Sequence, residues 1–141
     1  MQVRELMSTE VVTVGLEATL ADAADRLLNA GVGSVIVVED GEPVGIVTES
    51  DVLRAARDTG NALRDIDVRE VGHGAVVTTS PSKAVTTVAR LMADEGVKKV
   101  PVMDGLDLVG MVTLTDIVWA LPSLRAETTA MEAVRDRWSP S

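Results

Sequence analysis

The chain contains one pattern twice. A shift of 65 residues places positions 3–53 on positions 68–118 without a gap. Both copies close on nearly the same phrase, GIVTESD at 45–51 and GMVTLTD at 110–116. An internal repeat of this kind indicates one structural unit that is built twice. Two copies of a strand, a threonine and an aspartate predict two equivalent sites, or one shared cleft with two ends.

The two copies are expected to share one core. A copy of about 50–60 residues would bury only about 60% of its unfolded surface and would be marginally stable alone. The whole chain has 141 residues, and a domain of that size buries about 68–70% of its unfolded surface. We therefore predict a single compact unit in which the apolar faces of two halves meet.

The composition argues against several classes of function. The net charge is −9, and phenylalanine and tyrosine are absent, whereas nucleic-acid sites use clustered basic residues and aromatic platforms. Cysteine is absent, which excludes disulfides, thiolate nucleophiles and cysteine metal sites. No segment approaches the roughly 20 apolar residues of a membrane helix, and the start does not read as a signal peptide. We expect a cytoplasmic protein that binds neither nucleic acid nor membranes.

Each copy predicts five elements in the order β-α-β-β-α. Apolar residues spaced by three and four indicate two helices that end just before Gly31 and Gly96, where a helix C-terminus favours glycine. Pro122 is expected to end the last helix, and residues 123–138 to form one more amphipathic helix. The expected strands are 11–14, 34–38 and 43–47, then 76–79, 99–103 and 108–112, and the expected second helices are 48–57 and 113–121. The expected division is 1–57, a linker at 58–67, 68–121 and a tail at 122–141.

The repeated Thr-x-x-Asp has two interpretations. In a capping box, the Thr48 hydroxyl accepts from the Asp51 amide and the Asp51 carboxylate accepts from the Thr48 amide. That role leaves Gly45 and Gly110 unexplained, since glycine inside a strand marks a close approach of backbone or ligand. The alternative is a ligand site, because a helix N-terminus attracts phosphate and a carboxylate one turn later accepts from ribose hydroxyls. Both interpretations stay open at this point.

Two tandem β-α-β-β-α halves, each ending in Gly-x-x-Thr-x-x-Asp, resemble a CBS-domain pair, or Bateman module, over residues 3–120. The chain looks like a stand-alone CBS-domain protein. The resemblance implies an α+β fold in which the halves pack about a pseudo-twofold axis and leave two clefts. Such clefts bind adenosine compounds, among them AMP, ADP, ATP and S-adenosylmethionine, as effectors and not as required cofactors.

The resemblance also implies a role for each residue of the site. Each cleft takes its motif from one half and its base-holding strands from the other. Asp51 and Asp116 would accept from ribose hydroxyls. The phosphate side would be formed by Thr48 and Thr113, helped by Ser50 and Thr115. The base would lie near Ile46 and Met111, with Thr13 and Val32 serving one cleft and Thr78 and Val97 the other.

The two clefts are expected to differ in charge. Lys98 and Lys99 stand where the first copy has Gly33 and Ser34. If clefts are built across the halves, the cleft of Asp51 gains both lysines and the other cleft gains neither. Adjacent strand residues point to opposite faces, so we expect one lysine to reach a ligand, where a charge-assisted contact contributes about 1.5–3 kcal/mol. The Asp51 cleft should then prefer phosphorylated nucleotides, unless both lysines merely flank a strand at the surface.

No constellation of catalytic residues is visible, so an enzyme is not expected. The single histidine, His73, is interpreted as a structural or solvated loop residue, and the methionines Met92, Met103 and Met111 as core filling. We predict an adenine-nucleotide-binding regulatory module that forms a homodimer and signals to an effector protein. The alternative is a ligand-free structural or dimerisation adaptor acting through protein partners. Trp119 is expected to be buried against the other half or a second subunit, and Trp138 to anchor the tail.

Overall fold

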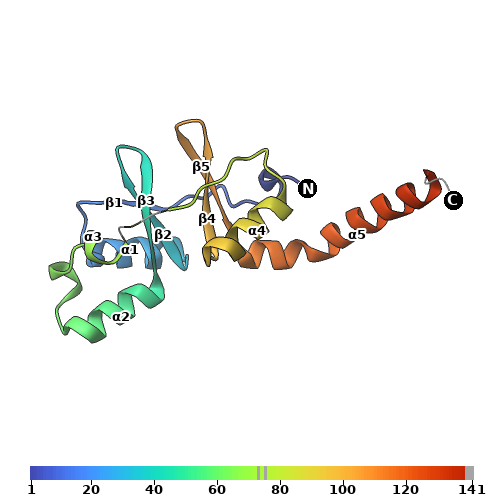
Figure 1. Cartoon of the computed structure of the whole chain (residues 1–141). Helices are drawn as coiled ribbons and strands as arrows, with labels where there is room; N and C mark the ends of the chain where they lie inside the picture. The colour runs from blue at the N-terminus through green and yellow to red at the C-terminus, as the bar shows by residue number, and fades with distance from the viewer. Residues whose placement is uncertain (73, 75, 139–141) are drawn as a thin grey trace.

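The structure is a computed structural model that describes residues 1–72, 74 and 76–138, with side chains up to residue 127. Its elements in chain order are η1 (Val3–Glu5), β1 (Thr13–Gly15), α1 (Leu20–Ala30), β2 (Ser34–Glu39), β3 (Glu42–Thr48), α2 (Glu49–Thr59), η2 (Leu63–Asp65), α3 (Arg69–Gly72), α4 (Val85–Glu95), β4 (Lys99–Asp104), β5 (Asp107–Thr113) and α5 (Leu114–Trp138). The hairpins β2–β3 and β4–β5 stand side by side, with α1 to α3 beside the first and α4 and α5 beside the second (Figure 1). The mixed α+β fold predicted from the repeat is confirmed.

Local sequence signals set the ends of the helices and the turns. Gly31 and Gly96 follow α1 and α4 with left-handed φ angles of 65° and 66°, a conformation that glycine adopts without strain. The β2–β3 hairpin turns at Asp40 and Gly41, whose φ angles are 52° and 80°. An aspartate followed by glycine suits such a two-residue turn. The helix ends predicted just before Gly31 and Gly96 are confirmed.

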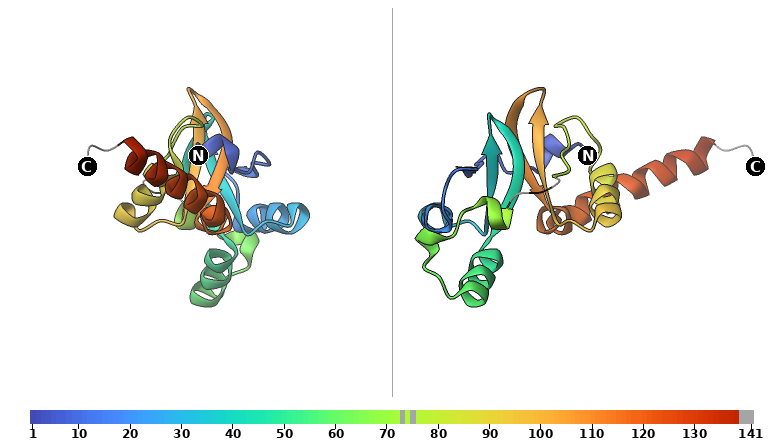
Figure 2. Two further views of the ribbon diagram at one scale, coloured as in Figure 1. Left: turned by 90° about the vertical axis from the view of Figure 1, so that its right-hand side faces the viewer. Right: turned by 60° about the vertical axis from the view of Figure 1, so that its left-hand side comes forward.

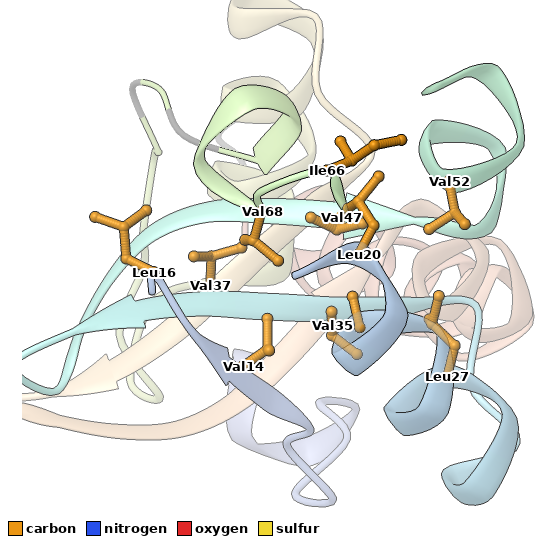
Figure 3. Close-up of a cluster of buried hydrophobic side chains, with 11 residues drawn as sticks. Val14, Leu16, Leu20, Leu27, Val35, Val37, Val47, Val52, Ile66 and Val68 are labelled. Atoms are coloured by element: carbon orange, nitrogen blue, oxygen red, sulfur yellow. The ribbon is translucent and has the colours of Figure 1, made fainter. Parts of the chain in front are cut away.

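The single shared core expected for the two copies is wrong, because the buried apolar residues form two clusters, one in each half. Each cluster is completed by chain from the start of the other copy or just before it. Val3, the first residue of the first copy, is fully buried among residues of α4, β4 and β5 in the second half. Ile66, with 2% of its surface exposed, and Val68 join the first core, where they lie beside Leu20 and Val47 (Figure 3). The predicted linker at 58–67 is thus more than a polar connector, because its end forms part of the first core.

Prolines reduce the second sheet to two strands. In the first half, β1 pairs in parallel with β2, and the Ile36 amide donates to the Val12 carbonyl at 2.9 Å. The counterpart of Ile36 is Pro101, and the counterpart of Leu16, whose amide also bonds to β2, is Pro81. Proline has no amide hydrogen to donate. The strand predicted at 76–79 is therefore reduced to one parallel bridge between Thr79 and Val102, and the strand predicted at 11–14 lies at Thr13–Gly15.

The predicted helix end at Pro122 is wrong. α5 runs from Leu114 to Trp138 with Pro122 inside it, and its later part projects away from the body of the molecule (Figures 1 and 2). A proline inside a helix leaves the carbonyl four residues earlier without its donor. That residue is Val118, which is exposed, so water can bind its carbonyl. Among the described residues, no helix combines the length and apolar character needed to cross a bilayer.

Candidate ligand-binding clefts

A cleft between the halves, cleft 1, has a volume of about 560 Å³, within the usual range of small-molecule sites. Ile46, Thr48 and Asp51 line it from the first half, and Val97, Lys98 and Lys99 from the second. These six residues were expected in one site, and the fold brings them together. Val76 and Val77 also line it, whereas the expected Thr78 and Ser50 do not. The connecting segment, residues 60–74 after α2, adds three further lining residues, Val71, Gly72 and Gly74.

The corner at Thr48 forms the predicted capping box and still leaves atoms for a ligand. The Thr48 amide donates to Asp51 Oδ2 at 2.9 Å, and the Asp51 amide donates to Thr48 Oγ1 at 3.1 Å. The Thr48 hydroxyl, accepting from an amide, keeps its own hydrogen to donate. Asp51 Oδ1 lies 3.3 Å from Nη1 of Arg54, and the Asp51 side chain is 26% exposed. The structural and the ligand-binding interpretations are therefore compatible.

Another Thr-x-x-Asp capping box, at the start of α1, serves as an internal comparison. The Thr19 amide donates to Asp22 Oδ2 at 2.9 Å, and the Asp22 amide donates to Thr19 Oγ1 at 3.3 Å. The residue three before Thr19 is Leu16 and not glycine, and neither Thr19 nor Asp22 lines cleft 1. Thr-x-x-Asp by itself is thus a helix cap. Its position at the mouth of a cleft is what distinguishes the repeated motif.

The second cleft, cleft 2, is smaller, at about 200 Å³. Met111 and Thr113 line it from the second half and Val32 from the first, as expected. The expected residues Thr13, Thr115 and Asp116 do not line it. Asp116 does cap α5, accepting from the Thr113 amide at 2.9 Å. The remaining lining residues are Ser8, Glu10, Val11, Val12, Gly33, Ser34, Ile36 and Lys99.

Cleft 2 is reduced by the chain's own N-terminal segment. Ser8 and Met111 exchange two backbone hydrogen bonds of 2.9 and 3.0 Å. A Cβ on Gly110 would lie 2.8 Å from Met7 Sδ and 2.9 Å from the Ser8 carbonyl oxygen. Gly110 is therefore explained by a close approach of backbone. At the position equivalent to Met7, cleft 1 has Gly72, which places no side chain there.

One prediction about charge is wrong. Lys99 lines both clefts, whereas the cleft of the second motif was expected to contain no lysine. Lys99 is half-buried at the first residue of β4, a position that borders both clefts. Glu10 also lines cleft 2 and was missed. The sequence already contained this difference between the clefts, because the residue equivalent to Glu10 in the second copy is the uncharged Ala75.

The remaining sequence expectations have different outcomes. Met92 and Met111 are buried and Met103 is half-buried, as predicted for core residues. Trp119 is 81% exposed, so its predicted burial against the other half is wrong. His73 and the side chain of Trp138 lie outside what the structure describes.

A third cavity, of about 500 Å³, lies between α2, η2 and α3 and was not predicted. Its acidic lining residues are Asp51, Asp58, Asp65 and Glu70. Within the described part of the chain, no group of three or more acidic or histidine side chains is placed to hold a metal ion. This cavity adjoins cleft 1 through Asp51 and Val71, which line both.

Comparisons with known proteins agree with this geometry. CBS domain-containing protein YhcV of Bacillus subtilis is 33% identical over 117 residues, which are 82% of this chain and 81% of that protein. An uncharacterised protein of Methanopyrus kandleri is 31% identical over 126 residues, which are 88% of this chain. The chain spans 64% of the length of that relative.

A solved structure matches the arrangement of both halves. The CBS domain pair of protein MJ0100, in complex with 5′-methylthioadenosine and S-adenosyl-L-methionine, has a TM-score of 0.75 at 25% identity. The match covers 87% of this chain and 97% of that chain. The family model of the CBS domain matches residues 3–58 and 68–123. With the repeat, the fold and both motifs in agreement, this chain belongs to the CBS-domain family and consists of a CBS pair.

Proposed function

We propose that the protein is a regulatory module that binds an adenosine-type ligand between its two CBS domains, with cleft 1 as the main site. The observation that carries this proposal is the Thr48–Asp51 corner, which shares a cleft of about 560 Å³ with Lys98 and Lys99 from the other half. The adenosine ligands of the MJ0100 pair support the same class of ligand. We assign the protein no catalytic activity.

The lining of cleft 1 suits the parts of a nucleotide. Asp51 Oδ1 would accept from ribose hydroxyls after Arg54 moves aside. The Thr48 hydroxyl would donate to a phosphate oxygen, with a lysine from the other half adding a charge-assisted contact. Val77 and Val97 would provide an apolar wall for the base. AMP, ADP, ATP and S-adenosylmethionine remain the candidate ligands.

A ligand in cleft 1 would touch both halves and could thereby send a signal. Filling the cleft would favour one relative orientation of the halves over another. The shift in that equilibrium can be no larger than the difference in ligand affinity between the two orientations. We propose that a second copy of the chain or an effector protein senses the change.

An adaptor without ligand is the second candidate function. The observation that favours it is a set of exposed apolar residues on α2 and α5, namely Leu53, Val118, Trp119 and Leu121. These residues suit contact with another protein surface. They would equally serve the homodimer that we propose for the regulatory module, so exposure alone does not separate the two candidates.

Thermal unfolding with added ligands separates them. A ligand at 100 times its dissociation constant stabilises a protein by about 2.7 kcal/mol, which corresponds to a Tm increase of roughly 5–10 °C for a domain of this size. We expect such an increase with at least one of AMP, ADP, ATP, S-adenosylmethionine and NAD. Unchanged melting curves across this panel would refute ligand binding and favour the adaptor.

A further inference from the structure

We infer that Lys99 makes the two clefts compete for anions, so that a phosphate bound in cleft 1 weakens the binding of a second phosphorylated ligand in cleft 2. The inference rests on the proposed function, because it requires a ligand in each cleft. It extends that function from a pair of sites to a coupling between them.

The position of Lys99 is the first support. Lys99 begins β4, pairs with Thr113 of β5 and is half-buried. Lys99 lines both clefts, whereas its repeat counterpart, Ser34, lines cleft 2 and not cleft 1. At equivalent positions of the two copies, the short residue Ser34 lines one cleft and the long residue Lys99 lines both. A single ammonium group cannot bind a phosphate in both clefts at once.

The charges around Lys99 are the second support. Lys98 lines cleft 1 as well, so that cleft keeps one cation wherever Lys99 points. Among the described residues that line cleft 2, Lys99 is the only basic one and Glu10 the only acidic one. None of the ion pairs found among the described residues includes Lys99, so its side chain can change rotamer without breaking one of them. When Lys99 turns to cleft 1, no basic side chain of cleft 2 offsets the repulsion between the Glu10 carboxylate and an incoming phosphate.

The expected coupling is about tenfold or more in affinity, since one charge-assisted contact changes affinity by roughly ten- to a hundredfold. Coupling between two binding sites is reciprocal, so a phosphate in cleft 2 must weaken cleft 1 by the same factor. An uncharged nucleoside does not draw the ammonium, and two such molecules are expected to bind independently.

The test uses isothermal titration calorimetry with AMP and, separately, with adenosine. Asp51→Ala weakens cleft 1 roughly ten- to a hundredfold, so that AMP can bind cleft 2 of this variant while cleft 1 is still empty. We expect AMP to bind cleft 2 of this variant at least about tenfold more tightly than the second AMP binds the parent protein. Lys99→Met should abolish this difference, because methionine keeps much of the length without the charge. Lys98→Met is the matched control, which should weaken the first binding step and leave the difference unchanged. Circular-dichroism melting curves establish that each variant is folded.

The outcomes separate the inference from the proposed function. Equal AMP affinities for cleft 2 with cleft 1 filled or empty overturn the coupling, and so does a difference that persists in Lys99→Met. If the parent binds one AMP only, a cleft 2 that binds AMP in Asp51→Ala supports strong coupling, and a silent cleft 2 refutes it. Absence of heat with AMP, adenosine and S-adenosylmethionine in the parent overturns the proposed function and the coupling together.

Discussion

The two roles of the repeated Thr-x-x-Asp corner can be separated by one pair of substitutions. Asp51→Ala removes the carboxylate that accepts from the Thr48 amide at 2.9 Å. Asp22→Ala removes the carboxylate in the same position of the α1 capping box, also at 2.9 Å from its amide donor. The two aspartates thus cap helices with the same geometry, but only Asp51 lines cleft 1.

The stability loss is expected to be similar in both variants. A helix cap typically contributes about 1 kcal/mol. Asp51 also pairs with Arg54, but the Arg54 side chain is 59% exposed, and an ion pair in contact with water adds only about 0.2–1 kcal/mol. We therefore expect each variant to lose about 1 kcal/mol of unfolding free energy, with a decrease in Tm of about 3 °C. Urea unfolding measures both losses on the same scale.

The effect on ligand binding is expected to differ sharply. Loss of a carboxylate that accepts from ribose removes a charge-assisted contact worth about 1.5–3 kcal/mol, which lowers affinity roughly ten- to a hundredfold. Asp22→Ala should bind AMP as the parent does, and calorimetry measures both affinities. Unchanged AMP affinity in a folded Asp51→Ala protein would refute a role in ribose binding. Equal losses of affinity in both variants would mean that helix capping alone controls the site.

Three further predictions concern packing and assembly. Gly72→Ala should cost about 1–3 kcal/mol in urea unfolding, because its Cβ would lie 2.5 and 2.9 Å from methyl groups of two buried valines, whereas Gly74→Ala, with open space around it, should change stability little. A cost at Gly72 no larger than at Gly74 would contradict the packing. Pro101→Ile should create a slowly exchanging amide at residue 101, visible by hydrogen exchange; rapid exchange there would show that the missing donor is not what limits the second sheet. Trp119→Glu should dissociate the proposed homodimer in analytical ultracentrifugation, while Leu28→Glu, at a side chain 79% exposed on α1, should not; a dimer that withstands Trp119→Glu excludes this part of α5 from the interface.

Most elements of the fold could be predicted because their signals are local. Glycine past a helix, as at Gly31, and the Asp40–Gly41 turn act through the φ angles of one or two residues. Pro101 was recognisable as a missing donor. The loss of a strand at 76–79 was not predictable, because it depends on which residues of β4 face Thr79. The helix end predicted at Pro122 was wrong because proline was treated as ending any helix. A helix tolerates a proline where water can bind the carbonyl that loses its donor, here that of Val118.

The site residues could be predicted by type but not by placement. The repeat identifies Thr48 and Asp51, and the cross-half construction brings in Val97. The sequence could not predict that Val3 packs in the core of the second half and Ile66 in the core of the first. An apolar residue such as Val3 carries no information about which of two similar cores it joins. The size of each cleft depends on this packing, since Met7 reaches Gly110 only after its segment has packed on the second half.

The difference between the clefts follows from a few substitutions on a duplicated scaffold. Cleft 1 contacts both halves and also Gly72 and Gly74 of the connecting segment, whose preceding residues Ile66 and Val68 belong to the first core. A ligand in cleft 1 would touch both halves and the segment that connects them. In cleft 2 the chain's own Ser8 is already bonded to Met111 by two hydrogen bonds, so a ligand has less room and less structure left to rearrange. We therefore expect the change in the relative orientation of the halves to depend on the ligand in cleft 1. A ligand in cleft 2 is expected to affect it by competing for Lys99, which lines both clefts.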